Sequence, residues 1–137
     1  MMDNSIFPSK KTSTRNIQYR KSNWKIHEFE IWSGERICKV SSLCMKGSLL
    51  IWIGEQQLRL ANVALGMPGS REVGEGSAAT ALLGEDEAGA ANLARRLATR
   101  LHRPVYICMG KTFDRFTSPL VEKGIAMEIK QHPNYFI

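Results

Sequence analysis

The residues of this sequence that could carry chemistry include a glycine-rich segment. Gly74, Gly76 and Ala79 have the spacing of a dinucleotide-binding fingerprint, in which glycines let the backbone approach a pyrophosphate at a helix N-terminus. No predicted strand runs directly into the segment, and the neighbouring Glu72 and Glu75 would repel phosphate. We therefore interpret this segment as a plain surface loop.

Cysteine and histidine chemistry is the second possibility. A cysteine nucleophile needs a base within hydrogen-bond reach, and none of the three histidines lies in a recognisable catalytic motif. The three cysteines lie in predicted strands among apolar residues, where cysteine usually behaves as a small buried hydrophobe. Their odd number and spacing fit neither a disulfide framework nor a zinc site. We expect no catalytic residue, no metal and no cofactor. These residues are Cys38, Cys44, Cys108, His27, His102 and His132.

Basic residues form two groups with different meanings. Four arginines, Arg95, Arg96, Arg100 and Arg103, follow the exposed side of a predicted helix. They could meet phosphate or an acidic protein surface, or they could form a solvated face that complements the helix dipole. The net charge of +6 comes mostly from the N-terminal segment. No structured nucleic-acid-binding motif accompanies that segment, so we do not expect nucleic acid as a partner.

The N-terminal residues 1–24 have no apolar period and predict a flexible basic leader, followed by a single domain over 25–137. The first 20 residues contain charge where a signal peptide would be apolar, and no apolar run approaches the roughly 18 residues of a membrane helix. With no disulfide pattern, this predicts a cytoplasmic protein, with the nucleus as a further location, and no membrane partner.

The strongest structural signal is the run 49–53, Leu-Leu-Ile-Trp-Ile, which is apolar at every position. As a strand it would need cover on both faces, because successive side chains point to opposite sides. The chain offers only two predicted helices, enough for one face. The sequence therefore predicts that another protein covers the second face.

Further strands surround this run. Residues 25–45 are rich in β-branched and aromatic types, and Gly34 with Glu35 interrupts them, either as a hairpin turn or as a bulge in one long strand. Turns at 46–48 and 54–56 predict two successive hairpins and hence a meander. The remaining predicted strands are 57–65, 77–83 and 105–109, with a glycine-rich loop at 66–76.

Two helices complete the predicted fold. Acidic residues 85–87 open the first, Pro104 stops it, and one apolar stripe runs along it. The small alanines of the stripe would let the helix lie close to a sheet. Ser118 and Pro119 predict an N-cap and first helical residue for the second, which ends at His132 before Pro133. The sequence does not decide whether the tail 135–137 docks on the domain or stays loose. The stripe consists of Ala90, Leu93, Ala94, Leu97 and Leu101.

Six segments of the chain are informative when taken in order: 49–54, 58–65, 81–85, 92–98, 104–107 and 120–125. Together they resemble the proteasome assembly chaperone 4 family, and the resemblance covers about residues 25–133. It implies an α+β fold with a six-stranded antiparallel sheet, helices on one face, and the other face laid against a related small chaperone in a heterodimer. It also implies a non-enzymatic role: the heterodimer binds α subunits of the 20S proteasome, promotes ordered assembly of the α ring and then dissociates.

Two other interpretations stay open. A small trafficking or signalling scaffold of roadblock or longin type also uses a sheet backed by helices, and a homodimer could form when the partner is absent. The candidates for the partner-binding sheet face are Leu50, Trp52, Ala61, Val63, Tyr106 and Cys108.

Overall fold

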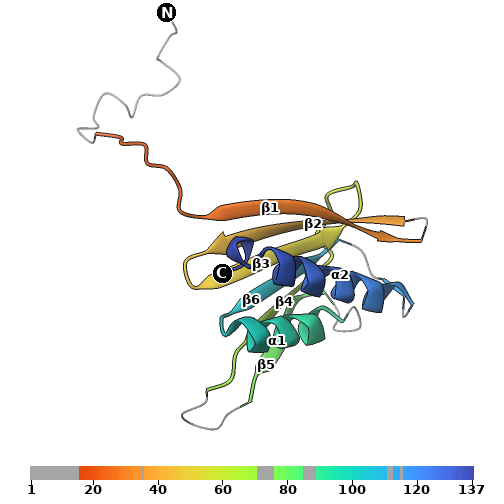
Figure 1. Cartoon of the computed structure of the whole chain (residues 1–137). Coiled ribbons are helices and arrows are strands. Elements are labelled where there is room, and N and C mark those ends of the chain that lie inside the picture. The colour runs from red at the N-terminus through yellow and green to blue at the C-terminus, as the bar shows by residue number, and fades with distance from the viewer. Residues whose placement is uncertain (1–15, 35, 71–75, 85–88, 111–112, 115) are drawn as a thin grey trace, which may run out of the picture.

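The structure is a computed structural model, and it describes residues 16–34, 36–70, 76–84, 89–110, 113–114 and 116–137. Within them, six strands form one sheet and two α-helices lie on one side of it (Figure 1). The elements are β1 (Lys25–Ser33), β2 (Arg36–Met45), β3 (Ser48–Gly54), β4 (Asn62–Met67), β5 (Ala78–Leu83), α1 (Ala90–Leu101), β6 (Val105–Met109), α2 (Thr117–Gln131) and a short 3-10 helix, η3 (Pro133–Tyr135).

The strand order in the sheet is β1-β2-β3-β6-β4-β5. All neighbouring strands are antiparallel except β3 and β6, which run parallel. The predicted α+β class and the count of about six strands are confirmed. The second predicted hairpin, at 54–56, is wrong, because β6 inserts between β3 and β4. Turn residues indicate that the chain reverses direction, but they do not indicate which distant strand will pair with β3.

Two tight turns connect the first three strands and fix their antiparallel pairing. Ser33 pairs with Arg36 across β1 and β2, so the interruption at Gly34 is a hairpin turn rather than a bulge. Gly34 has φ +64° and Gly47, between β2 and β3, has φ +79°. This left-handed backbone favours glycine because it has no Cβ. Glu35 lies outside the described residues.

Two predicted boundaries around β4 are corrected. This strand begins at Asn62 rather than at residue 57, because the preceding segment crosses the end of β6 instead of pairing in the sheet. It ends at Met67, so Gly66 belongs to the strand and not to the following loop. Residues 71–75 of the predicted loop lie outside the described part. The predicted strand at 77–83 is confirmed as β5.

The first helix packs closely on the sheet, as its alanines predict. All five predicted stripe residues are buried, together with Ala91 and Ala98. A Cβ at Gly66 of β4 would lie 2.2 Å from the backbone oxygen of Ala94, so the strand and the helix meet almost backbone to backbone. The acidic residues 85–87, predicted to open this helix, lie outside the described residues.

The second helix begins at Thr117, one residue before the predicted cap at Ser118. A carboxylate oxygen of Asp114 accepts hydrogen bonds from the backbone N–H groups of Phe116 at 3.0 Å and Thr117 at 2.6 Å. Asp114 therefore satisfies N–H groups that a helix start leaves without intrahelical partners.

The C-terminal tail docks on the helix-covered face beside β1. Phe136 is fully buried, and the Tyr135 ring stacks on His27 with a centroid separation of 4.1 Å. Nζ of Lys25 donates to the carbonyl oxygen of Ile137 at 2.8 Å. The question of a docked or loose tail is thus decided by contacts between the two ends of the domain.

One hydrophobic core lies between the sheet and the helices. Leu49, Ile51 and Ile53 of β3 point into it and are each 0% exposed. On the same face, Ile31 of β1 lies within contact distance of α2 at Gly124, and Gly66 of β4 meets α1. Both helices therefore cover one face of the sheet, and the opposite face has no helix over it in the described part of the chain.

Candidate partner-binding face

The uncovered face of the sheet, here called the open face, carries two rows of side chains that run across the strands. Cross-strand pairing and the alternation of side chains along each strand define both rows. The first row is Leu43, Leu50, Tyr106 and Leu65. The second row is Ser41, Trp52, Cys108 and Val63. Seven of these eight side chains are apolar or aromatic, so the middle of the open face resembles a sheet interior more than a surface.

The edges of the open face also carry exposed apolar side chains, which on β1 flank the charged Glu28 and Glu30. Ile26 and Trp32 on β1 are each 70% exposed, and Leu83 on β5 is 49% exposed. The central Leu50 and Trp52 are half-buried by their neighbours alone. A contiguous apolar surface of this kind is typical of an interaction site.

The structure brings five of the six predicted partner-binding residues together on this face. They come from three neighbouring strands, β3, β6 and β4. Ala61 precedes β4 and is exposed outside the sheet. Sequence reasoning missed Leu43 and Leu65, although Leu65 could have been found because it alternates with Val63. The five are Leu50, Trp52, Val63, Tyr106 and Cys108.

The segment 55–61, here called the crossover loop, passes from β3 to β4 over the end of β6. The backbone N–H of Ala61 donates to the carbonyl oxygen of Met109 at 2.8 Å, which holds the loop to β6. Leu58 and Leu60 of the loop are 86% and 56% exposed. With Trp52 and Ser41 they line an apolar hollow of about 360 Å³. The loop thus forms one wall of the open face.

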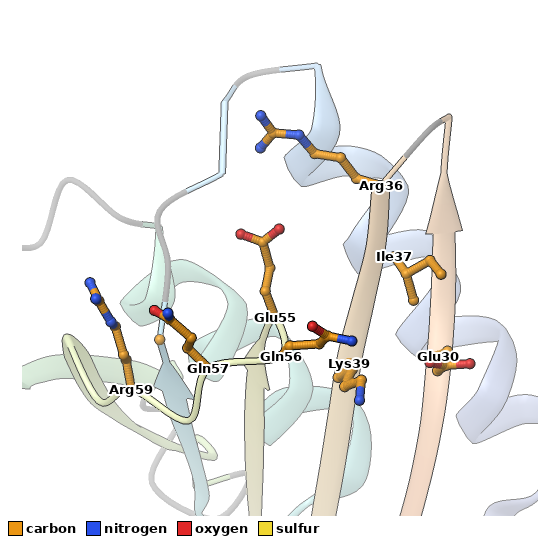
Figure 2. Close-up of a pocket in the computed structure, with 9 residues that line it drawn as sticks. Glu30, Arg36, Ile37, Lys39, Glu55, Gln56, Gln57 and Arg59 are labelled. Carbon is orange, nitrogen blue, oxygen red and sulfur yellow. The ribbon is translucent and has the colours of Figure 1, made fainter.

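A second, polar pocket of about 680 Å³ lies at the end of the sheet where the crossover loop begins (Figure 2). Figure 2 shows Glu55 between the strand that carries Arg36 and the loop segment that carries Arg59. Glu30 and Lys39 lie on the neighbouring strands β1 and β2. The described residues of this lining carry side chains of both charges and can bind a polar protein segment.

The three cysteines are free and buried. Burial, with a smaller contribution from the negative charge of Glu55, raises the pKa of the Cys38 thiol to about 11. Burial also raises the pKa of Cys108. Because the thiolate is the nucleophile and the metal ligand, a raised pKa makes Cys38 and Cys108 poorly suited to either role. Among the described residues, no group of three or more potential metal ligands occurs.

His27 contributes to packing between β1, α2 and the C-terminal tail. Its Nε2 lies 2.7 Å from a carboxylate oxygen of Glu128 on α2, and its ring stacks on Tyr135. Three of the four predicted stripe arginines, Arg95, Arg96 and Arg100, are exposed on α1, and Arg96 forms an ion pair with Glu122 of α2. Arg103 follows the end of α1 and is half-buried, so the prediction that it continues the exposed stripe is wrong. The dinucleotide fingerprint is excluded by its context, because Gly76 leads into the strand β5 and not into a helix. Its Gly74 lies outside the described residues.

A single sheet with helices on one face and an apolar surface on the other defines a class of small two-layer α+β protein, in which the helices of the described residues cover only one sheet face. Residues 39–110 match the model of the family described as proteasome assembly chaperone 4. That match covers more than half of the chain, and the chain belongs to this family. No curated protein matches it.

Among solved structures, the chain is similar to a protein from the "Crystal Structure of a Novel Chaperone Complex for Yeast 20S Proteasome Assembly". The TM-score is 0.54 and the sequence identity is 19%, and the alignment covers 78% of this chain and 91% of the yeast chain. At this identity the likeness shows that the two chains share a fold.

Proposed function

We propose that this chain is a proteasome assembly chaperone subunit that pairs with a related small chaperone through its open face. The pair promotes ordered assembly of the α ring of the 20S proteasome and then dissociates. Membership of the proteasome assembly chaperone 4 family supports the role. The yeast protein of similar fold comes from a complex described as a chaperone complex for 20S proteasome assembly, which supports a chaperone partner.

The open face is the observation that carries this proposal. Its central rows are apolar across β2, β3, β6 and β4, and burying such area against a second sheet removes it from water at a gain of about 25 cal/mol per Å². Two sheets pack face to face with side chains of both inner faces interdigitating. A partner with a similar sheet would supply the cover that the helices give on the other side.

The role needs no bond to be made or broken. A chaperone pair that binds neighbouring α subunits with different affinities favours one order of assembly, because specificity is a difference between binding free energies. An apolar open face, together with buried thiols whose pKa is raised at Cys38 and Cys108, supports a non-enzymatic role. The α subunits themselves would contact surfaces outside the open face, which the partner chaperone occupies.

The same proposal includes a cytoplasmic location, with the nucleus as a further site of action. No helix in the described part of the chain is long and apolar enough to cross a membrane. Fluorescence imaging of the tagged full chain would test the location, and accumulation within a membrane-bound organelle would contradict it.

The test of function is co-purification from cell extract with identification of the bound chains by mass spectrometry. We expect the wild-type chain to recover a second small chaperone and proteasome α subunits. Leu50→Arg places a charge in the middle of the open face and should abolish recovery of the chaperone. Leu120→Arg is the matched control, because Leu120 is a 49% exposed leucine on α2.

Circular dichroism establishes whether both variants are folded. A Trp52→Ala protein that stays folded but loses its partner would independently support the interface. Recovery of trafficking or signalling proteins, with no chaperone and no α subunit, would overturn the proposal in favour of a roadblock-like or longin-like scaffold.

A further inference from the structure

Two carboxylates stand on the open face at the β1 edge. Glu28 and Glu30 are exposed, and their alternate positions put both side chains on the same side as the apolar rows. Lys39 of β2 lies directly opposite Glu30 in the sheet, whereas Ser41 lies opposite Glu28. Within the described part of the chain, neither carboxylate has an ion-pair partner. Glu28 is therefore the charge that the sheet itself does not balance.

A hollow of about 710 Å³ lies beside these carboxylates. Glu28 and Glu30 of β1 with Lys39 of β2 line one side of it, and Trp52 with Gln56 and Leu58 of the crossover loop lines the other. With two carboxylates and one cation, the hollow combines an end of net negative charge with an aromatic and aliphatic wall. This combination suits a side chain with an apolar stem and a cationic head, because the stem packs on the wall while the head meets the carboxylates.

We propose that this hollow receives a long basic side chain, arginine or lysine, from the sheet of the partner chaperone. The inference rests on the proposed pairing through the open face and specifies the chemistry of the partner. When the two sheets close, the open face loses water, and an unpaired buried carboxylate is strongly unfavourable. A partner with a cation at this position keeps Glu28 charged and paired, and a partner without one is rejected.

A second copy of this chain fits the hollow less well. Among the described strand residues, Lys39 is the only cation on the open face, and it already lies opposite Glu30. Arg59 of the crossover loop also lines the apolar hollow beside Trp52, and Glu55 of the same loop shares the pocket of Figure 2 with it. Two copies would therefore bring more carboxylates than cations into one interface. The acidic edge therefore favours binding of the related chaperone over self-association. The specificity arises because unpaired carboxylates make the homodimer unfavourable.

The test compares the affinity of the purified full chain for the chaperone identified by co-purification, at low and high salt. We expect Glu28→Gln to weaken binding about tenfold or more and to reduce the salt dependence, while Glu28→Lys abolishes binding. Glu122→Gln makes the same change on α2, away from the open face, and should alter the affinity less than about twofold, because the exposed ion pair that it removes contributes little.

Sedimentation of the chain alone separates the partner from a second copy. We expect Glu28→Gln to leave self-association unchanged or to strengthen it. The inference is overturned if Glu28→Gln binds the chaperone as tightly as the wild type, or if it weakens self-association as much as partner binding. If the wild-type chain recovers no chaperone at all, the proposed function fails and this inference falls with it.

Discussion

The indole Nε1 of Trp52 donates a hydrogen bond to the backbone carbonyl oxygen of Arg59 at 2.9 Å. This bond ties the crossover loop to the centre of the open face. Two glycines make room for it: a Cβ at Gly54 would lie 2.5 Å from the Trp52 ring, and a Cβ at Gly110 would lie 2.5 Å from the Arg59 oxygen. The same tryptophan is thus both a wall of the candidate interface and the anchor of the loop beside it.

Replacing Trp52 with phenylalanine keeps an aromatic ring but removes the donor. We expect a loss of about 0.5–1.5 kcal/mol in the free energy of unfolding, the usual net value of one hydrogen bond. Amide exchange of residues 56–60 should become faster, because the loop loses its anchor. Trp32→Phe on the 70% exposed tryptophan of β1 is the control. Unchanged exchange in the loop of Trp52→Phe would contradict the anchoring role.

Gly66→Ala tests the close approach of β4 and α1. The added methyl would lie 2.2 Å from the backbone oxygen of Ala94, and backbone cannot move aside as a flexible side chain can. We expect the variant to lose about 1–3 kcal/mol of stability, the usual cost of overpacking, measured by urea unfolding. Gly76→Ala, whose Cβ meets nothing within 4 Å, should not be destabilised.

Phe136→Ala tests the docking of the tail. Phe136 is 0% exposed in the core, so truncation should cost about 3–5 kcal/mol through lost burial and a cavity. Ile137→Ala is the matched control, because its side chain is 55% exposed and surface changes usually stay within about 0.5 kcal/mol. Equal unfolding midpoints for the two variants would show that the tail does not contribute to stability.

The Asp114 carboxylate predicts a pH dependence. Backbone and side-chain hydrogen bonds from Thr117, with a further backbone bond from Phe116, lower the pKa of Asp114 below its ordinary value of 3.8. A lowered pKa in the folded state means that the carboxylate stabilises the fold above that ordinary value. This contribution is lost as the pH falls through the folded-state pKa.

Asp114→Ala should therefore be less stable than the wild type at neutral pH, and the difference should shrink in acid. Urea unfolding as a function of pH measures it, and Asp114→Asn, which keeps an acceptor without the charge, should lie between the two. A difference that stays constant from neutral pH into acid would rule out the carboxylate as the cause.

The sequence by itself determined the local elements of this protein. The stripe on α1, the stops at Pro104 and Pro133 and the apolar strand β3 follow from patterns of neighbouring residues, because helix and strand periodicity are local properties. Two-sided apolarity also identified β3 as a strand that needs cover on both faces. Most of the candidate partner-binding residues could be named from that alternation alone.

Only the tertiary structure decided which strands are neighbours. The insertion of β6 beside β3, the passage of the crossover loop over β6 and the burial of Phe136 all join residues far apart in the chain. So does the placement of Glu28 beside Trp52 and Leu58 in one hollow. Such contacts depend on the packing of whole elements, and a local pattern does not specify the distant surface that an element meets.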